Sequence, residues 1–371
     1  MSEFLLPPGF KDEIFEQAGL EHKYKNKIID LLQLNGYELV KTPLIEYANS
    51  ENVNNVFLIK EKKELRDFIL RNDITLQIAR LANARLKFKT RPLKLCYYGE
   101  VVRKKGNILR PERQFLQVGA ECIGEKSYLA DVEMLDLAYQ ALTIVGIKNI
   151  SIDLSSSEFL NFLLKNIKQK KNWDKITSFI RRKDLTNCLK YIDSSLHDYT
   201  IHLLSCSGNL EEKKEILDKL ALNQNTKIAT EQLLAIYSSF KSKYPEVNFF
   251  LDLSESNYLE YHTGTRFTFY ARNVRGEVAR GGRYISKEDS KLESSTGFTC
   301  YMDTIIRASS FTDKINKILI PFDTSEERKK ELIEEGYILE TFFVNDKEIK
   351  KIALEKQIKF YLVDRKVISI K

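Results

Sequence analysis

The chain has 371 residues, of which 43% are hydrophobic and 30% are charged. The length predicts two or three domains, and the composition excludes a collagen, a disordered tail and a small disulfide-stabilised scaffold. The 59 lysines and arginines exceed the 52 acidic residues, giving a net charge of +7, which fits either a polyanionic partner or biased codon usage.

Helices and strands alternate through the first part of the chain. Apolar residues recur at helical spacing between residues 17 and 35, and Gly36 predicts the end of that helix. Residues 37–41 and 65–70 have the pattern of strands, and a second helix opens at Asn72.

A pair of strands joined by a basic loop is the most informative segment. The strands are predicted over residues 93–103 and 114–123, and the loop over 104–111. Alternate residues of a strand point to opposite faces, so the second strand has two distinct sides. One side carries Leu116, Val118, Ala120 and Cys122, and the other carries Phe115, Gln117, Gly119 and Glu121.

A predicted helix over residues 128–145 is followed by a lysine-rich helical segment over 157–247. Within it, residues 165–183 contain eight basic residues and one acid, so this window alone accounts for the net charge of +7. Such a run is typically a solvated helical surface, and an RNA contact is the less favoured interpretation.

Strands return at residues 248–253, 266–272 and 277–280, and a helix is predicted over 296–308. The remaining residues alternate strands and helices as a small α/β unit does. We therefore expect an α+β fold, an antiparallel sheet flanked by helices. Its expected domains are a core (1–156 and 248–310), a helical insertion (157–247) and a small C-terminal α/β domain (315–371).

The strand face that carries Gln117 and Glu121 admits two interpretations. A polar face on an antiparallel strand is most often solvated. However, Gly119 permits the close approach of another group, and the nearby Arg103 and Arg113 suit a zwitterionic or phosphorylated ligand. The pattern alone leaves both interpretations open.

Asp73 and Thr75 precede a predicted helix and are similarly ambiguous. An aspartate in this position commonly caps the helix, which is the favoured interpretation. A carboxylate and a hydroxyl at a strand–helix junction are also placed to accept an ammonium group.

Several classes of site lack support in the sequence. No metal-ligand spacing surrounds His262, and neither a P-loop, a dinucleotide-binding glycine motif nor a nucleophile elbow is present. The five cysteines lack a Cys-x-x-Cys pair, which is typical of reduced cytoplasmic thiols. Neither a signal peptide nor an apolar run of roughly 18–20 residues is found. We expect a soluble cytoplasmic protein without a metal or cofactor.

Sequence motifs in a fixed order extend these expectations. They are Pro7–Asp12, Gly36–Glu46, Leu70–Arg80, Tyr98–Arg103 with Gln114–Glu121, Glu260–Gly264, and Gly281–Tyr284. In this order they resemble the catalytic core of class II histidyl-tRNA synthetases, and more closely their paralogue, the regulatory subunit of ATP phosphoribosyltransferase. The resemblance covers residues 4–308 and implies a class II synthetase-like fold and homodimer, with an abbreviated anticodon-binding-like C-terminal unit.

The resemblance also implies roles for single residues. Asp73, Thr75 and Gln117 lie where the synthetase holds the ammonium group of histidine, and Glu121 lies where it meets the imidazole. Arg103 is at the position that contacts the α-phosphate of ATP. The predicted histidine-like pocket consists of Asp73, Thr75, Arg103, Arg113, Gln117, Glu121, Tyr261 and His262.

Two departures from the family pattern decide the expected function. The arginine that stabilises the transition state of adenylation is replaced by Asn257, and the arginine that clamps the γ-phosphate is replaced by Thr304. Loss of one such group commonly lowers the rate by about 10²–10³.

We therefore expect a noncatalytic regulatory subunit in a hetero-oligomer with the short-form catalytic subunit of ATP phosphoribosyltransferase. It would activate that subunit and mediate feedback by histidine, the product of the pathway. The alternatives are an active histidyl-tRNA synthetase and an RNA-binding paralogue that uses the basic window. Neither a membrane nor tRNA is an expected partner.

Overall fold

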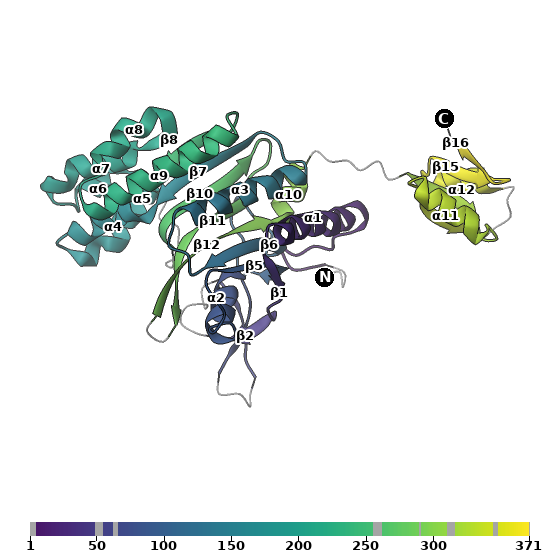
Figure 1. Ribbon diagram of the computed structural model, residues 1–371, viewed down its shortest axis with the longest axis horizontal. Helices are drawn as coiled ribbons and strands as arrows, with labels where there is room; N and C mark the ends of the chain where they lie inside the picture. The colour runs from purple at the N-terminus through teal and green to yellow at the C-terminus, as the bar shows by residue number, and fades with distance from the viewer. Residues whose placement is uncertain are drawn as a thin grey trace. The chain divides into compact units, whose positions relative to one another are not determined.

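The computed structural model describes residues 5–48, 55–61, 66–254, 262–288, 291–309, 316–343 and 348–370. The chain divides into two units, Met1–Ser310 and Phe311–Lys371 (Figure 1). Each unit has its own hydrophobic cores. All of the residues predicted to bind a ligand belong to the first unit.

The first unit is built on a nine-stranded sheet. The expected antiparallel sheet flanked by helices is confirmed for its central strands, whereas the pairs β1–β5 and β7–β9 are parallel and make the sheet mixed. In order, the strands are β1 (Glu38–Val40), β5 (Leu93–Val102), β6 (Gln114–Ile123), β12 (Lys291–Tyr301), β11 (Ala279–Glu288), β10 (His262–Ala271), β7 (Ile150–Ser156), β9 (Asn248–Asp252) and β8 (Ser207–Asn209).

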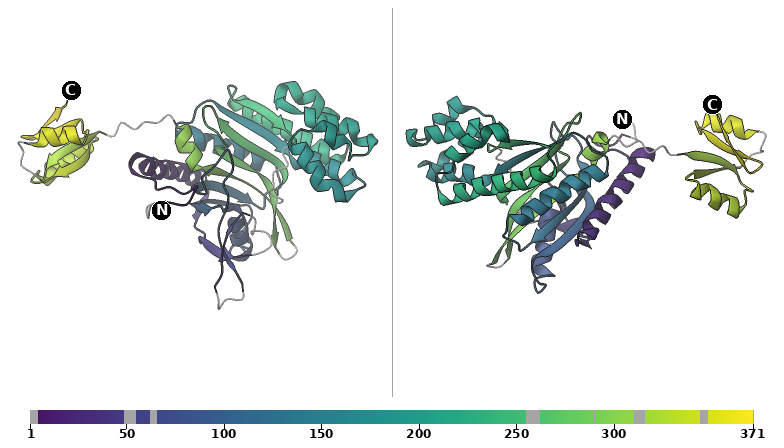
Figure 2. Two further views of the ribbon diagram at one scale, coloured as in Figure 1. Left: turned by 180° about the vertical axis from the view of Figure 1, so that it is seen from behind. Right: turned by 45° about the horizontal axis from the view of Figure 1, so that its top comes forward.

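Helices cover both faces of the sheet near its centre (Figures 1 and 2). Helix α1 buries Tyr24, Ile28 and Leu32, whose four-residue spacing places them on one side of the helix. Gly36, with a positive φ of 84°, follows its end. The helices of this face are α1 (Phe15–Leu34), α3 (Leu129–Ile144) and α10 (Met302–Ala308), and the opposite face carries α2 (Thr75–Ala84).

Strand β6 contributes to a different core on each of its faces. Val118 and Ala120 pack in the cluster that contains α1 and α3. Phe115 and Ile123, on the other face, pack with Ile78 of α2. The alternation of side chains along this one strand therefore divides the interior into an α1/α3 side and an α2 side.

The segment between β7 and β9 is largely helical and belongs to the first unit by its contacts. Its apolar residues extend the α1/α3 core, so a separate insertion domain stays a prediction. None of the helices that the structure describes is long and apolar enough to span a membrane. The segment contains α4 (Ser157–Asn166), η1 (Lys170–Asn172), α5 (Trp173–Arg181), α6 (Leu185–Leu189), η2 (Ser194–Leu196), α7 (His197–Ser205), α8 (Leu210–Lys219) and α9 (Gln224–Lys243).

Three short strands between β1 and α2 in the chain form a small second sheet, with the strand order β2–β4–β3. Several of its apolar side chains are exposed, including Ile45 and Leu58. Its strands are β2 (Ile45–Tyr47), β4 (Phe68–Leu70) and β3 (Phe57–Ile59).

The helix predicted over residues 296–308 is wrong in its first half. Strand β12 continues to Tyr301, and only Met302–Ala308 is helical. Residues 295–301 pair with β6 on one side, and residues of β12 pair with β11 on the other. A central strand buried on both faces has no alternating pattern, and its apolar residues can be mistaken for part of a helix.

The second unit is a four-stranded sheet with one helix packed on each face. Ile318 and Ile320 of β13 contact the core that contains Leu332 of α11, whereas Leu319 points to the core that contains Ile349 of α12. The elements are β13 (Lys317–Pro321), α11 (Glu326–Glu334), β14 (Ile338–Phe342), α12 (Ile349–Glu355), β15 (Phe360–Val363) and β16 (Lys366–Ser369).

A buried ion pair attaches the sheet to α3. The Nε of Arg283 in β11 lies 3.0 Å from Oδ2 of Asp131 in α3, and the Asp131 side chain is 2% exposed. The guanidinium also donates to the carbonyls of Glu125 and Ser127 and to the hydroxyl of Ser294. These bonds offset part of the cost of burying the charges.

Replacing Arg283→Met should lower the free energy of unfolding by about 3–5 kcal/mol, because the buried Asp131 carboxylate loses its partner. Urea unfolding measures the change. The matched control is Lys94→Met, which removes the half-exposed pair with Glu133 and should cost at most about 1 kcal/mol. Equal losses in the two variants would contradict the structural role of Arg283.

Candidate functional site

The polar face of β6 is buried. Gln117 is 0% exposed and Glu121 is 1% exposed, so the interpretation as a solvated strand face is wrong for these two residues. They are covered because the segment before α2 crosses this face, where Ile74 donates its N–H to Oε1 of Gln117. Buried polar groups without a structural partner are costly, so such a face needs internal or ligand hydrogen bonds.

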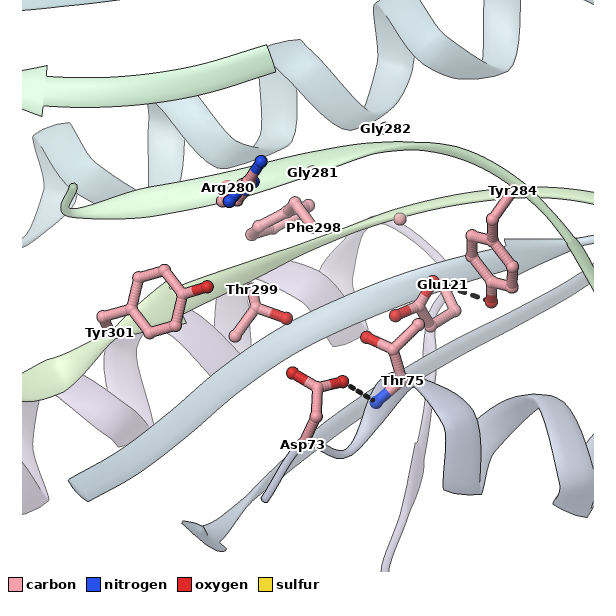
Figure 3. A pocket seen from close by; sticks show the side chains of 11 residues that line it. Asp73, Thr75, Glu121, Arg280, Gly281, Gly282, Tyr284, Phe298, Thr299 and Tyr301 are labelled. Carbon is pink, nitrogen blue, oxygen red and sulfur yellow. Dashed lines mark hydrogen bonds between the residues drawn. The ribbon is translucent and has the colours of Figure 1, made fainter. Parts of the chain in front are cut away.

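A cavity lies on this face between α2 and strands β6, β11 and β12 (Figure 3). Side chains from four separate elements therefore meet around it. The residues that line it are Asp73, Thr75, Glu121, Arg280, Gly281, Gly282, Tyr284, Gly297, Phe298, Thr299 and Tyr301.

Asp73 and Gln117 are linked at one side of the cavity. Oδ2 of Asp73 accepts a hydrogen bond from Nε2 of Gln117 at 3.1 Å, while Oδ1 accepts from the backbone N–H of Thr75 at 2.9 Å. The aspartate thus bonds to the first turn of α2, as expected of a capping residue, and also lines the cavity. The bond from Oδ1 to Thr75 agrees with the capping interpretation of Asp73, and its interpretation as an acceptor for an ammonium group stays a prediction.

Glu121 lies at the other side, among hydroxyl groups. Its carboxylate accepts hydrogen bonds from Tyr284 at 3.0 Å and from Tyr97 at 3.4 Å. Tyr97 also contacts the hydroxyl of Thr299 at 2.7 Å. Burial raises the pKa of Glu121 to about 8, against the lowering effect of hydrogen bonds from Thr75 and Tyr284. A carboxyl with this pKa is mostly neutral near physiological pH and becomes charged when a cation approaches.

Main-chain atoms form much of the wall opposite Glu121. A Cβ on Gly297 would overlap the Glu121 carboxylate, and one on Gly281 would overlap the carbonyl of Gly297 and the Phe267 ring. Glycine is therefore required for Glu121 to occupy its position against β12.

The cavity suits a small ligand with hydrogen-bond donors at two ends. The Asp73 carboxylate and the Thr75 hydroxyl can accept from an ammonium group, and Glu121 can accept from a second, protonated nitrogen. Within the described part of the chain, no group of three or more His, Cys, Asp or Glu residues could hold a metal ion.

Not all of the predicted pocket residues meet here. Arg103 instead lines a basic hollow beside the loop that joins β5 to β6. The Arg113 guanidinium packs over the rings of Phe10 and Phe57 and donates to the carbonyl of Pro8. Tyr261 lies outside the described residues, as does the side chain of His262.

The structure adds Tyr97, Tyr284 and Thr299, which the sequence analysis did not assign to the pocket. Tyr284 is the last residue of the motif Gly281–Tyr284. Tyr97 lies on the apolar side of a strand in which apolar and polar residues alternate. A tyrosine in such a pattern is usually a core residue, so only the pairing of β5 and β11 with their neighbours brings the two hydroxyls to Glu121.

The position just after β12 at which the arginine that clamps the γ-phosphate is predicted to be missing is buried. Thr304 is 0% exposed and accepts hydrogen bonds from Arg110 at 3.4 Å and Arg307 at 3.2 Å. The Arg110 guanidinium also lies 3.4 Å from Asp303 and 3.3 Å from Glu277. Both carboxylates therefore neutralise a cation that is fixed inside the fold.

Comparison with known proteins identifies relatives of the chain. The histidyl-tRNA synthetase family model matches residues 9–305. The ATP phosphoribosyltransferase regulatory subunit of Rhodospirillum centenum is 33% identical over 90% of this chain and 88% of its own length.

Solved structures share the fold. An ATP phosphoribosyltransferase regulatory subunit/histidyl-tRNA synthetase from Bacillus halodurans C superposes with a TM-score of 0.75 at 22% identity, covering 95% of this chain and 97% of its own. A chain of the ATP phosphoribosyl transferase (HisG:HisZ) complex from Thermotoga maritima gives a TM-score of 0.60 at 21% identity, covering 76% and 97%.

The raised pKa of Glu121 predicts a pH-dependent stability. The folded protein keeps a proton up to about pH 8 that the unfolded chain releases near 4.5. The contribution of the neutral carboxyl is therefore fully present below pH 4.5 and is lost as the pH rises through 8. Melting temperatures of wild type should fall relative to Glu121→Gln as the pH rises from 4.5 to about 8. Parallel curves for the two proteins would exclude a shifted Glu121.

Proposed function

The chain belongs to the histidyl-tRNA synthetase family and, within it, to the ATP phosphoribosyltransferase regulatory subunits, and from this membership we propose that it is a noncatalytic subunit. It activates a separate, short-form catalytic subunit, which converts ATP and phosphoribosyl pyrophosphate to phosphoribosyl-ATP. Histidine, the pathway product, acts back on the assembly through this subunit.

The proposal that the chain itself is noncatalytic rests above all on Thr304. A neutral, buried hydroxyl stands where the resemblance requires an arginine, and the adjacent Arg110 is neutralised by Asp303 and Glu277. Developing negative charge at phosphorus would therefore lack a preorganised cation at this position. Asn257, the second substitution, lies outside the described residues and stays a prediction.

The cavity beside Glu121 is the proposed histidine site. Asp73 and Thr75 would accept hydrogen bonds from the α-ammonium group, and Gln117 holds Asp73 in place. Glu121 would meet the imidazole, whose protonated form draws out the charged state of the carboxylate. Arg103 and Arg113 are more distant components of this proposal, because neither lines the cavity.

Feedback is proposed to act as a shift between two arrangements of the hetero-oligomer. Histidine would favour the inactive arrangement by binding it more tightly, and the catalytic substrates would favour the other. The subunit is proposed to form a class II-type homodimer through the segment 36–46, where Leu39, Leu44 and Ile45 are exposed. Five buried, free cysteines support the proposed cytoplasmic location.

Co-expression with a short-form catalytic subunit tests the main proposal. The purified complex should form phosphoribosyl-ATP faster than the catalytic subunit alone, and added histidine should lower that rate. Histidine-dependent exchange of pyrophosphate into ATP by the pure chain would instead establish an active synthetase. Absence of both association and activation would refute the regulatory role.

Titration calorimetry tests the histidine site. Glu121→Ala should weaken histidine binding about tenfold or more, because a hydrogen bond to a charged group contributes about 1.5–3 kcal/mol. Glu231→Ala, at an exposed position of α9, is the matched control and should bind like wild type. No heat of binding with the intact chain would mean that the cavity does not bind histidine.

A further inference from the structure

The loop between β5 and β6 presents two neighbouring aliphatic side chains to solvent. Ile108 is 93% exposed and Leu109 is 51% exposed. Single exposed apolar residues are common on protein surfaces. Two large ones side by side at the tip of a loop are of interest when the loop is held rigidly, because an ordered apolar tip gains free energy on being covered.

This loop is anchored from beneath by the residue that follows the tip. Arg110 is 1% exposed, and its guanidinium lies 3.7 Å from the centre of the Tyr301 ring. It also donates to the carbonyl of Glu277 at 2.9 Å and forms ion pairs with Glu277 and Asp303. Withdrawing this side chain would remove the cation from Glu277 and would leave Asp303 with Arg307 alone, so the anchor resists displacement.

Asparagine side chains fix the rest of the loop. Oδ1 of Asn107 accepts from the backbone N–H groups of Leu109 at 2.9 Å and Arg110 at 2.6 Å, which shapes the turn at the tip. Asn55 exchanges two hydrogen bonds with the backbone of Lys105, at 2.7 Å and 3.0 Å. The tip is therefore held by bonds on both of its sides.

Positive charge flanks the apolar tip. Lys104 and Lys105 are exposed, and no carboxylate in the described ranges lies within 4.0 Å of either ammonium group. Their charge is thus available to an acidic surface, whereas the tip itself offers aliphatic contact. Charges at the rim of an interface mainly accelerate association, and a buried apolar centre supplies most of the affinity.

We propose that the tip Ile108–Leu109 is a preformed docking element that inserts into an apolar, acid-rimmed site on the catalytic subunit. This inference rests on the proposed regulatory function and names the surface that serves it. A rigid loop loses little conformational entropy on binding, which favours affinity. Single-stranded nucleic acid fits the tip less well, because it binds by stacking on aromatic rings and the tip is aliphatic.

Ile108 and Leu109 also lie outside the segment 36–46 proposed for the homodimer. A second copy of the chain would therefore cover the exposed apolar residues of segment 36–46. The tip Ile108–Leu109 then stays available to a different protein. Because the loop is anchored in the free subunit, we expect it to dock with little change in backbone conformation.

The test uses the full chain with the double substitution Ile108→Asp and Leu109→Asp. The dissociation constant for the catalytic subunit should rise about tenfold or more, as expected when a central apolar anchor is lost. The melting temperature, homodimer mass and histidine binding should stay as in wild type, since both side chains point to solvent. Leu222→Asp, at a position 59% exposed between α8 and α9, is the matched control.

A second pair of substitutions examines the rim. Lys104→Glu with Lys105→Glu should slow association with the catalytic subunit and reduce its dependence on salt, with a smaller effect on dissociation. This kinetic separation distinguishes the charged rim from the apolar tip.

Unchanged affinity of the Ile108→Asp/Leu109→Asp variant, while wild type binds and activates the catalytic subunit, would overturn the docking proposal alone. Failure of wild type to bind that subunit would overturn the regulatory function and the docking proposal together. Loss of the homodimer in the double variant would assign the tip to self-association. Binding of transfer RNA by wild type that the double variant loses would assign it to RNA, and either result would also overturn the proposal.

Discussion

The burial of β6 on both faces is the constraint from which the rest of the first unit follows. A polar face on an antiparallel strand is ordinarily solvated, and a buried one needs hydrogen-bond partners inside the protein or on a ligand. Here Val118 and Ala120 pack under α1 and α3, while Gln117 and Glu121 are enclosed by the segment before α2 and by β12. One strand thus supplies both a hydrophobic core and the interior of a polar cavity.

Two buried arginines, Arg283 and Arg110, have partners inside the fold that neutralise their charges, so these charges are not available to a ligand. Arg283 is surrounded by Asp131 and by main-chain carbonyls, and Arg110 by Glu277, Asp303 and the Tyr301 ring. All three guanidinium nitrogens of Arg283 donate hydrogen bonds, as the planar donor fork of arginine permits. Arg110 donates from Nη2, and its Nε and Nη1 lie against the carboxylates of Asp303 and Glu277. The positive charges of these two arginines are consequently structural, whereas Arg280 lines the cavity itself.

Sequence patterns predicted the helices and strands whose apolar residues follow one clear period. They failed where contacts between distant elements decide whether a segment is a helix, a strand or part of the site. Helix α1 and strand β6 follow from the spacing of Ile28 and Leu32 and from the alternation around Gln117. Strand β12 was not predicted, because residues 296–301 are buried on both of its faces and were assigned to a helix. The burial of Gln117 and Glu121 and the addition of Tyr97 to the site depend on which strands become neighbours, and a local pattern does not contain that information.

The glycine wall at Gly281 and Gly297 has a consequence for how such a cavity changes during evolution. On this side the size of the cavity is set by the main chains of the paired strands β11 and β12. Enlarging or narrowing the cavity there would require a shift of the sheet itself. Its chemical preference is set by side chains on other elements, such as Thr75 and Tyr284. Ligand identity can therefore drift by exchange of functional groups while ligand size stays conserved.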